Sequence, residues 1–96
     1  MPMYVWIGRD CAAGVEGRTR LRPAHLERLR PLAEAGRIRF AGPLRDESGT
    51  PRGSLIVLEA THLSEARAIA AADPYATGGV FASWEVFETL QVFPEK

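Results

Sequence analysis

One histidine and one aspartate have the residue types and positions that proton transfer needs. His25 lies in a segment with helical periodicity, and Asp73 follows a second such segment. An aspartate that accepts one ring N–H fixes the tautomer of the histidine, which leaves the other nitrogen to act as general base or acid. The alternative is a structural hydrogen bond that ties two helix ends together. The spacing alone leaves both interpretations open.

The helical wheel places His25 on the buried side of its segment. With Leu29 at zero, His25 lies at about −40° at 100° per residue. This angle falls within the stripe formed by Leu26, Leu29, Leu32 and Ala33. Asp73 lies four residues after Ile69, on the inner stripe of its own helix, at a C-terminus where a carboxylate costs about 0.3–1 kcal/mol against the dipole. A nearby imidazole would offset that cost.

Other polar and glycine residues fall where strand ends and loops should share one edge of the sheet. The candidates for binding a substrate are Arg18, Arg20, Gly42, Pro43, Ser54 and Tyr75. An arginine could clamp a carboxylate, and the serine hydroxyl could point into a cleft. The arginines could equally be solvated loop cations, the Gly-Pro pair a strand terminator, the serine the first residue of a strand, and the tyrosine a core residue packed on a neighbouring strand.

Four strands and two helices must position these side chains. Apolar and alternating runs predict strands over residues 3–8, 37–43, 54–60 and 81–93, and helical spacing predicts helices over residues 22–35 and 63–72. Loops or turns are predicted over residues 9–20, 45–52 and 75–79. Pro31 should kink the first helix, because an interior proline deletes a hydrogen bond.

The order β-α-β-β-α-β predicts an α+β, ferredoxin-like sandwich with one antiparallel four-stranded sheet and both helices on one face. The first and third strands should be central, since they hold the most continuous apolar runs. The helices should run antiparallel, so that His25, opening the first, meets Asp73, closing the second. Val5 must face opposite to Tyr4 and Trp6, so the uncovered face is also apolar. A homodimer packed sheet to sheet would cover it.

Composition limits the classes of function. The chain has 96 residues, enough for a single domain over residues 1–96, and its 12 basic and 12 acidic side chains cancel. A neutral chain has no electrostatic basis for non-specific nucleic-acid binding, and nothing points to a membrane. One cysteine and two histidines are too few for a zinc motif, and no glycine-rich phosphate loop follows the first strand. We therefore expect a cytoplasmic protein without a metal or other cofactor.

A set of short segments, taken in order and spacing, has the pattern of a known family. They are Arg20, His25-Leu26, Leu29, Gly36, Ala41-Gly42-Pro43-Leu44, Gly53-Ser54, Glu59-Ala60, Glu65-Ala66 and Asp73-Pro74-Tyr75. With these residues the sequence resembles the YCII-related (YciI-like) family over nearly the whole chain. The resemblance implies a subunit of the dimeric α+β barrel superfamily, with His25 and Asp73 at the positions of the family's proposed active-site pair. At least one such protein eliminates chloride from a chlorinated aromatic hydroxyquinone. Pro31 and residues 11–17 look like local departures near the cleft entrance.

Together these observations predict a cofactor-independent enzyme of lyase, isomerase or dehydrochlorinase type acting on a small molecule. His25 would transfer the proton, and Asp73 would orient the imidazole and stabilise its charged form. The alternative is a non-catalytic module that binds a small ligand or regulates, with a structural His-Asp pair. A purely structural protein and a haem-binding member of the superfamily are more distant possibilities.

Overall fold

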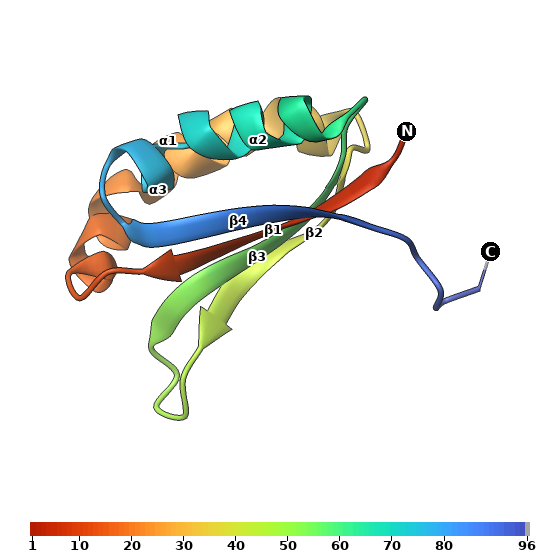
Figure 1. Cartoon of the computed structure of the whole chain (residues 1–96). Helices are drawn as coiled ribbons and strands as arrows, with labels where there is room; N and C mark the ends of the chain where they lie inside the picture. The colour runs from red at the N-terminus through yellow and green to blue at the C-terminus, as the bar shows by residue number, and fades with distance from the viewer. Residues whose placement is uncertain (96) are drawn as a thin grey trace.

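A four-stranded antiparallel sheet with the strand order β2-β3-β1-β4 forms one layer of the protein. The computed structural model describes residues 1–95. Its strands are β1 (Met3–Asp10), β2 (Ile38–Arg45), β3 (Pro51–Glu59) and β4 (Phe81–Thr89), and its helices are α1 (Gly14–Glu34), α2 (Leu63–Ala72) and α3 (Pro74–Thr77). Figure 1 shows the helices along one side of the sheet, with α1 and α2 running in opposite directions. The expected α+β, ferredoxin-like order is confirmed, with the short helix α3 added before β4.

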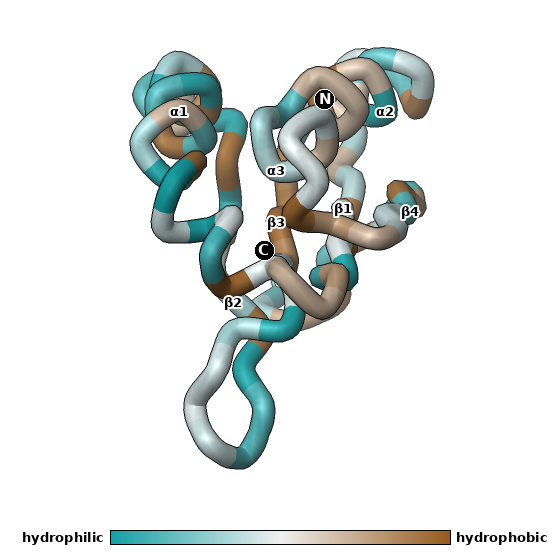
Figure 2. Tube along the Cα trace, turned by 90° about the vertical axis from the view of Figure 1, so that its left-hand side faces the viewer, coloured by the Kyte–Doolittle hydropathy of each residue, from teal (hydrophilic) through white to brown (hydrophobic). Residues whose placement is uncertain are grey.

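The two strands expected at the centre of the sheet, β1 and β3, do lie there. Trp6 pairs with Ile56 and Tyr4 pairs with Leu58, and all four side chains are buried beneath the helices. Central strands need apolar residues because both of their edges and at least one face are removed from water. In Figure 2 the hydrophobic colour accordingly lies on β3, whereas the hairpin tip between β2 and β3 is hydrophilic.

The prediction of a loop over residues 9–20 is wrong for most of these residues, since only residues 11–13 lie between a strand and a helix. Strand β1 continues to Asp10, and α1 begins at Gly14. The glycines that suggested a loop instead permit close packing: a Cβ on Gly17 would lie 2.8 Å from Val80 Cγ2, and one on Gly14 would lie 2.7 Å from Asp10 Oδ2. These glycines let the first turns of α1 approach the end of β1 and the start of β4.

Because α1 begins two turns earlier than expected, His25 lies in the middle of this helix and not at its start. His25 and Leu29 are buried, as the wheel predicts, but Leu26 and Ala33 on the same expected stripe are exposed. Pro23 and Pro31 both lie within the single helix Gly14–Glu34. The stripe facing the sheet is therefore narrower than the sequence suggests.

Asp73 is shared by two helices. It follows the last residue of α2, whose bounds match the prediction, and it is also the N-cap of α3. Its Oδ2 accepts a hydrogen bond from the backbone N–H of Tyr75 at 2.9 Å. A carboxylate is unfavourable at the C-terminus of α2, but the same carboxylate is favourable as the N-cap of α3. The sequence predicts a turn where α3 forms.

The final strand is shorter than predicted and ends at Thr89 instead of residue 93. Thr89 pairs with Met3, the first residue of β1, so the residues that follow have no strand beside them. Leu90 and Val92, which the predicted strand included, are accordingly exposed. The alternating apolar pattern continued past the point where a partner strand exists.

The β2–β3 hairpin is closed by Asp46. Its carboxylate accepts hydrogen bonds from Ser48 and Thr50 and pairs with Arg52 at 2.9 Å. The hydrogen bond from the Ser48 hydroxyl, with those from Arg52 and Thr50, lowers the pKa of Asp46 well below its usual value. With this closed turn, β2 extends to Arg45 and β3 begins at Pro51, so both strands exceed their predicted lengths there.

Candidate active site

His25 and Asp73 form a buried pair beneath α1. Nδ1 of His25 lies 2.7 Å from Oδ2 of Asp73, and both side chains are almost fully buried. An ionised carboxylate only accepts hydrogen bonds, so Nδ1 of His25 is the donor. In the neutral ring, Nε2 then carries the lone pair, and no hydrogen-bond partner for it is present within residues 1–95. The pair has the arrangement of a histidine base oriented by an aspartate.

Tyr75 fixes the plane of the imidazole. The rings of His25 and Tyr75 stack in parallel, with centroids 3.9 Å apart and planes 5° from each other. Phe81 contacts Tyr75 edge to face at 5.7 Å, which supports the tyrosine from the sheet side. Burial raises the pKa of the Tyr75 hydroxyl, and the nearby cations Arg18 and Arg22 oppose that rise. The phenol therefore stays protonated at neutral pH.

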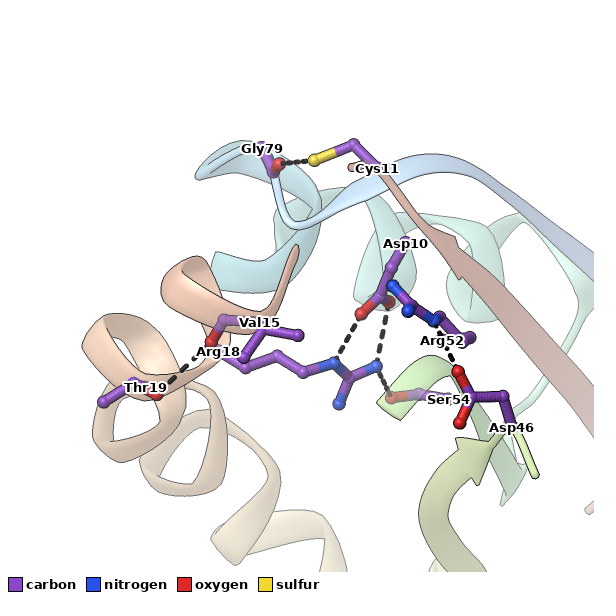
Figure 3. A network of polar contacts seen from close by, with 9 residues as sticks. All are labelled: Asp10, Cys11, Val15, Arg18, Thr19, Asp46, Arg52, Ser54 and Gly79. Carbon is purple, nitrogen blue, oxygen red and sulfur yellow. Dashed lines mark hydrogen bonds and ion pairs between the residues drawn. The ribbon is translucent and has the colours of Figure 1, made fainter. Parts of the chain in front are cut away.

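Arg18 lies in a second polar cluster at the end of β1. Its guanidinium donates to both carboxylate oxygens of Asp10, at 2.7 and 2.9 Å, and to the hydroxyl of Ser54 at 2.9 Å (Figure 3). The guanidinium carbon also lies 5.1 Å from the centre of the Tyr75 ring. A two-pronged ion pair of this kind holds an arginine in one orientation. Arg18 thus links Asp10, Ser54 and the tyrosine that stacks on the histidine.

These groups border a cavity of about 340 Å³ between α1 and the β2–β3 half of the sheet. Its walls come from one face of α1, from β2 and β3, and from Tyr75 of α3. The lining residues are Val15, Arg18, Thr19, Arg22, His25, Leu26, Leu29, Ala41, Gly42, Pro43, Pro51, Ser54, Ile56 and Tyr75. The volume suits a small molecule of about one ring, at the lower end of the usual range for ligand pockets.

The structure brings most of the predicted site residues to this cavity. Arg18, His25, Gly42, Pro43, Ser54 and Tyr75 line it, and Asp73 lies behind His25. Arg20 is exposed on α1 and is not part of the lining, because it falls on a different side of the helix from Arg18 and Arg22.

One charged residue that lines the cavity, Arg22, is not among the residues predicted from the sequence. Arg22 lines the cavity one helical turn after Arg18, and Asp10 holds Arg18 in place. A helix beginning at Gly14 would have placed residues 18, 22 and 25 on one face, at spacings of four and three. The helical spacing of these three residues could therefore have identified Arg22, but the prediction of a loop over residues 9–20 prevented it. Within residues 1–95, no three His, Cys, Asp or Glu side chains gather so as to hold a metal ion.

Fold and site together define a class of protein: a small ferredoxin-like α+β protein with a buried histidine–aspartate pair at the wall of one cleft. None of the helices over residues 1–95 has the length and apolar character to cross a membrane. The chain belongs to the YCII-related family, whose sequence profile matches residues 2–90. The resemblance found in the sequence is thereby confirmed.

Relatives at the sequence level cover nearly the full length. Protein YciI of Escherichia coli O6:H1 is 38% identical over 97 residues, covering 95% of this chain and 99% of that protein. An uncharacterized protein of Haemophilus influenzae is 33% identical over 96 residues, covering 94% and 98%. Both alignments therefore cover more than nine-tenths of this chain and of the relative.

Among solved structures, the fold is similar to that of the 5-chloro-2-hydroxyhydroquinone dehydrochlorinase TftG from Burkholderia phenoliruptrix AC1100, in complex with 2,5-dihydroxybenzoquinone. The TM-score is 0.78 at 24% identity, and the match covers 88% of this chain and 90% of that one. A NIPSNAP domain protein from Burkholderia xenovorans is more distant, with a TM-score of 0.55 at 16% identity, covering 100% and 99%. At these identities the similarity concerns the fold.

Proposed function

We propose that this protein is a cofactor-independent enzyme that transfers a proton to or from a small molecule, with His25 as the base and Asp73 as the residue that orients it. One observation carries the proposal: a buried His25–Asp73 hydrogen bond of 2.7 Å at the wall of a cavity of about 340 Å³. A purely structural pair has no need of an adjoining cavity, whereas a base must reach its substrate.

The reaction begins when Nε2 of His25 takes a proton from a C–H or O–H group of the substrate. The imidazolium formed is stabilised by the Asp73 carboxylate, and it stays in the plane set by Tyr75. The substrate anion can then be protonated at a different atom, which is isomerisation. Alternatively, its electron pair forms a double bond and expels a leaving group, which is elimination. In a dehydrochlorination the C–Cl bond breaks, chloride leaves with the bonding pair, and the imidazolium releases its proton to water.

The chemistry of the fold neighbour suggests where to begin the search for a substrate. TftG is a dehydrochlorinase whose complex contains a dihydroxybenzoquinone. The cavity here has a size suited to one ring, and the apolar side chains Leu26, Leu29 and Ile56 contribute to its walls. Hydroxylated and chlorinated rings are therefore the first substrates to test.

The wild-type protein should turn over at least one such ring compound without an added cofactor. The measurement follows chloride release by ion chromatography and the incorporation of solvent deuterium by NMR. These two readouts separate elimination from isomerisation. Saturable binding of the ring compounds without chloride release or deuterium exchange would instead assign the protein to the non-catalytic, ligand-binding class.

The face of the sheet away from the helices supports a second part of the proposal, a homodimer. Register pairs place Val5, Val57, Phe40 and Phe87 together on this face, and Ile7 and Leu55 beside them. Phe40 and Phe87 are more than half exposed in the single chain. An apolar sheet face of this kind is normally covered, and two copies related by a two-fold axis present the same surface to each other.

The substitution Phe87→Glu should convert the dimer to a monomer, because a buried, unpaired carboxylate within an apolar contact is costly. Light scattering coupled to gel filtration should give twice the chain mass of 10.5 kDa for the wild type and 10.5 kDa for the variant. Ala71→Glu adds the same charge on the exposed side of α2 and should leave the mass at the dimer value. A wild-type mass of 10.5 kDa, or an unchanged mass in Phe87→Glu, would contradict the dimer.

A further inference from the structure

The charges that line the cavity are unbalanced. Its lining contains two arginines and a histidine, and no aspartate or glutamate. Two of these three groups have an acidic partner behind the wall: Asp73 for His25 and Asp10 for Arg18. The pairing between Arg18 and Asp10 is close and shielded, since their side chains are only 11% and 2% exposed. The Arg18–Asp10 pair is therefore neutral as a whole.

Arg22 is the exception. Within residues 1–95, no carboxylate lies within the 4.0 Å that defines an ion pair for its guanidinium. It lies on the same face of α1 as Arg18 and His25, at spacings of four and three residues. Of the two arginines in the cavity lining, Arg22 is therefore the one without a carboxylate at contact distance, and it lies about one helical turn from the histidine.

A second observation places this charge close to the reacting region. Arg22 and Arg18 both act electrostatically on the hydroxyl of Tyr75, the tyrosine whose ring stacks on His25. The remaining walls are largely apolar, with Leu26, Leu29 and Ile56 among them. The Arg22 side chain is itself exposed, but an anion that pairs with it inside the cavity also lies against the apolar wall, where the pairing is stronger than in open water.

We propose that the cavity selects a small monoanion, whose carboxylate or ionised ring hydroxyl pairs with Arg22 while its apolar body lies against the aliphatic wall. The proposal rests on the proposed function and adds the class of substrate to it. Arg22 is the specificity-determining residue, and Arg18 is a positioning residue that acts through Tyr75. A neutral molecule of the same shape leaves Arg22 without a partner and binds less well.

Binding of matched pairs of probes tests this assignment without any turnover. Benzoate and benzamide differ in charge at nearly equal shape, and 2,4-dinitrophenolate and 1,3-dinitrobenzene provide the same comparison for an ionised ring hydroxyl. Dissociation constants are measured by calorimetry and protein-observed NMR for the wild type, Arg22→Gln, Arg22→Lys and Arg28→Gln. Arg28 is a matched control, because it is exposed on the same helix and does not line the cavity.

The wild type should prefer at least one anion over its neutral counterpart by about tenfold or more, as expected for a charge-assisted contact. Arg22→Gln should lose this preference, Arg22→Lys should retain part of it, and Arg28→Gln should retain all of it. The pair that shows the preference identifies the anion as a carboxylate or as an ionised hydroxyl.

Three results would overturn the assignment: equal affinity for anions and neutral molecules, an undiminished preference in Arg22→Gln, or no saturable binding of either anion at concentrations on the order of 10 mM. Because these experiments measure binding alone, such a result leaves proton transfer by His25 untouched. Conversely, an inactive protein that still shows the Arg22-dependent preference would contradict the catalytic proposal and keep the binding one.

Discussion

The substitution His25→Asn should reduce turnover by about 10²- to 10⁴-fold while the fold is retained. It removes the proposed base, Nε2, but keeps a donor for the hydrogen bond to Asp73. The asparagine amide can occupy the place of Nδ1 and donate to Asp73, but it has no counterpart of Nε2. We therefore expect steady-state kinetics to show a loss in kcat, and chemical denaturation to show a much smaller loss in stability.

Two further variants make this result specific. His25→Gln places its amide near Nε2 and gives up the bond to Asp73, so it should lose both activity and stability. His62→Asn removes the other histidine, which is exposed and caps α2, and asparagine is itself a good N-cap. His62→Asn should keep full turnover. Retained turnover in His25→Asn would exclude the imidazole from the mechanism.

The substitution Asp73→Ala should destabilise the protein by about 2–4 kcal/mol, since it removes the cap of α3 and leaves two buried donors unpaired. Oδ2 of Asp73 accepts from both Nδ1 of His25, at 2.7 Å, and the backbone N–H of Tyr75, at 2.9 Å. Urea denaturation, followed by circular dichroism, measures the free energy of unfolding. A change within ~0.5 kcal/mol would mean that the pair does not support the structure.

Asp73→Asn separates bracing from catalysis. Its amide oxygen can still accept both hydrogen bonds, but its NH2 group takes the place of Oδ1, which is buried without a hydrogen-bond partner within residues 1–95. Stability should therefore fall by about 1–3 kcal/mol, the cost of a buried unpaired donor. The negative charge that stabilises the imidazolium is lost, so turnover should fall by at least about tenfold. Full turnover in Asp73→Asn would show that Asp73 only positions the ring, whereas a large loss would assign it an electrostatic role.

Local patterns in the sequence determine much of the architecture. The continuous apolar runs in β1 and β3 predict central strands, and the structure places both there. The helical wheel predicts a buried His25, and the βαββαβ order predicts that Asp73 lies near it. These inferences hold because they depend on the pattern of hydrophobic side chains along the chain. The hydrophobicity of a side chain is known from the residue type alone.

The sequence did not reveal the start of α1. Gly14 and Gly17 are typical of loops, and local propensity could not show that Val80 and Asp10 approach these positions so closely that a side chain would collide. Close approach depends on residues distant in the chain. The same limit applies to β4, whose end is set by the first residue of β1 and not by its own alternating pattern.

Most of the residues near the cleft can be predicted from the sequence, whereas their roles depend on the tertiary structure. Arg18 could have been a solvated cation or an anion clamp, but Asp10 already occupies its guanidinium. Arg22 is not among the residues predicted from the sequence, yet of the two arginines that line the cavity it is the one without an acidic partner within residues 1–95. The physical reason is that a charge acts through its neighbours in space, and those neighbours are chosen by the packing of α1 on the sheet.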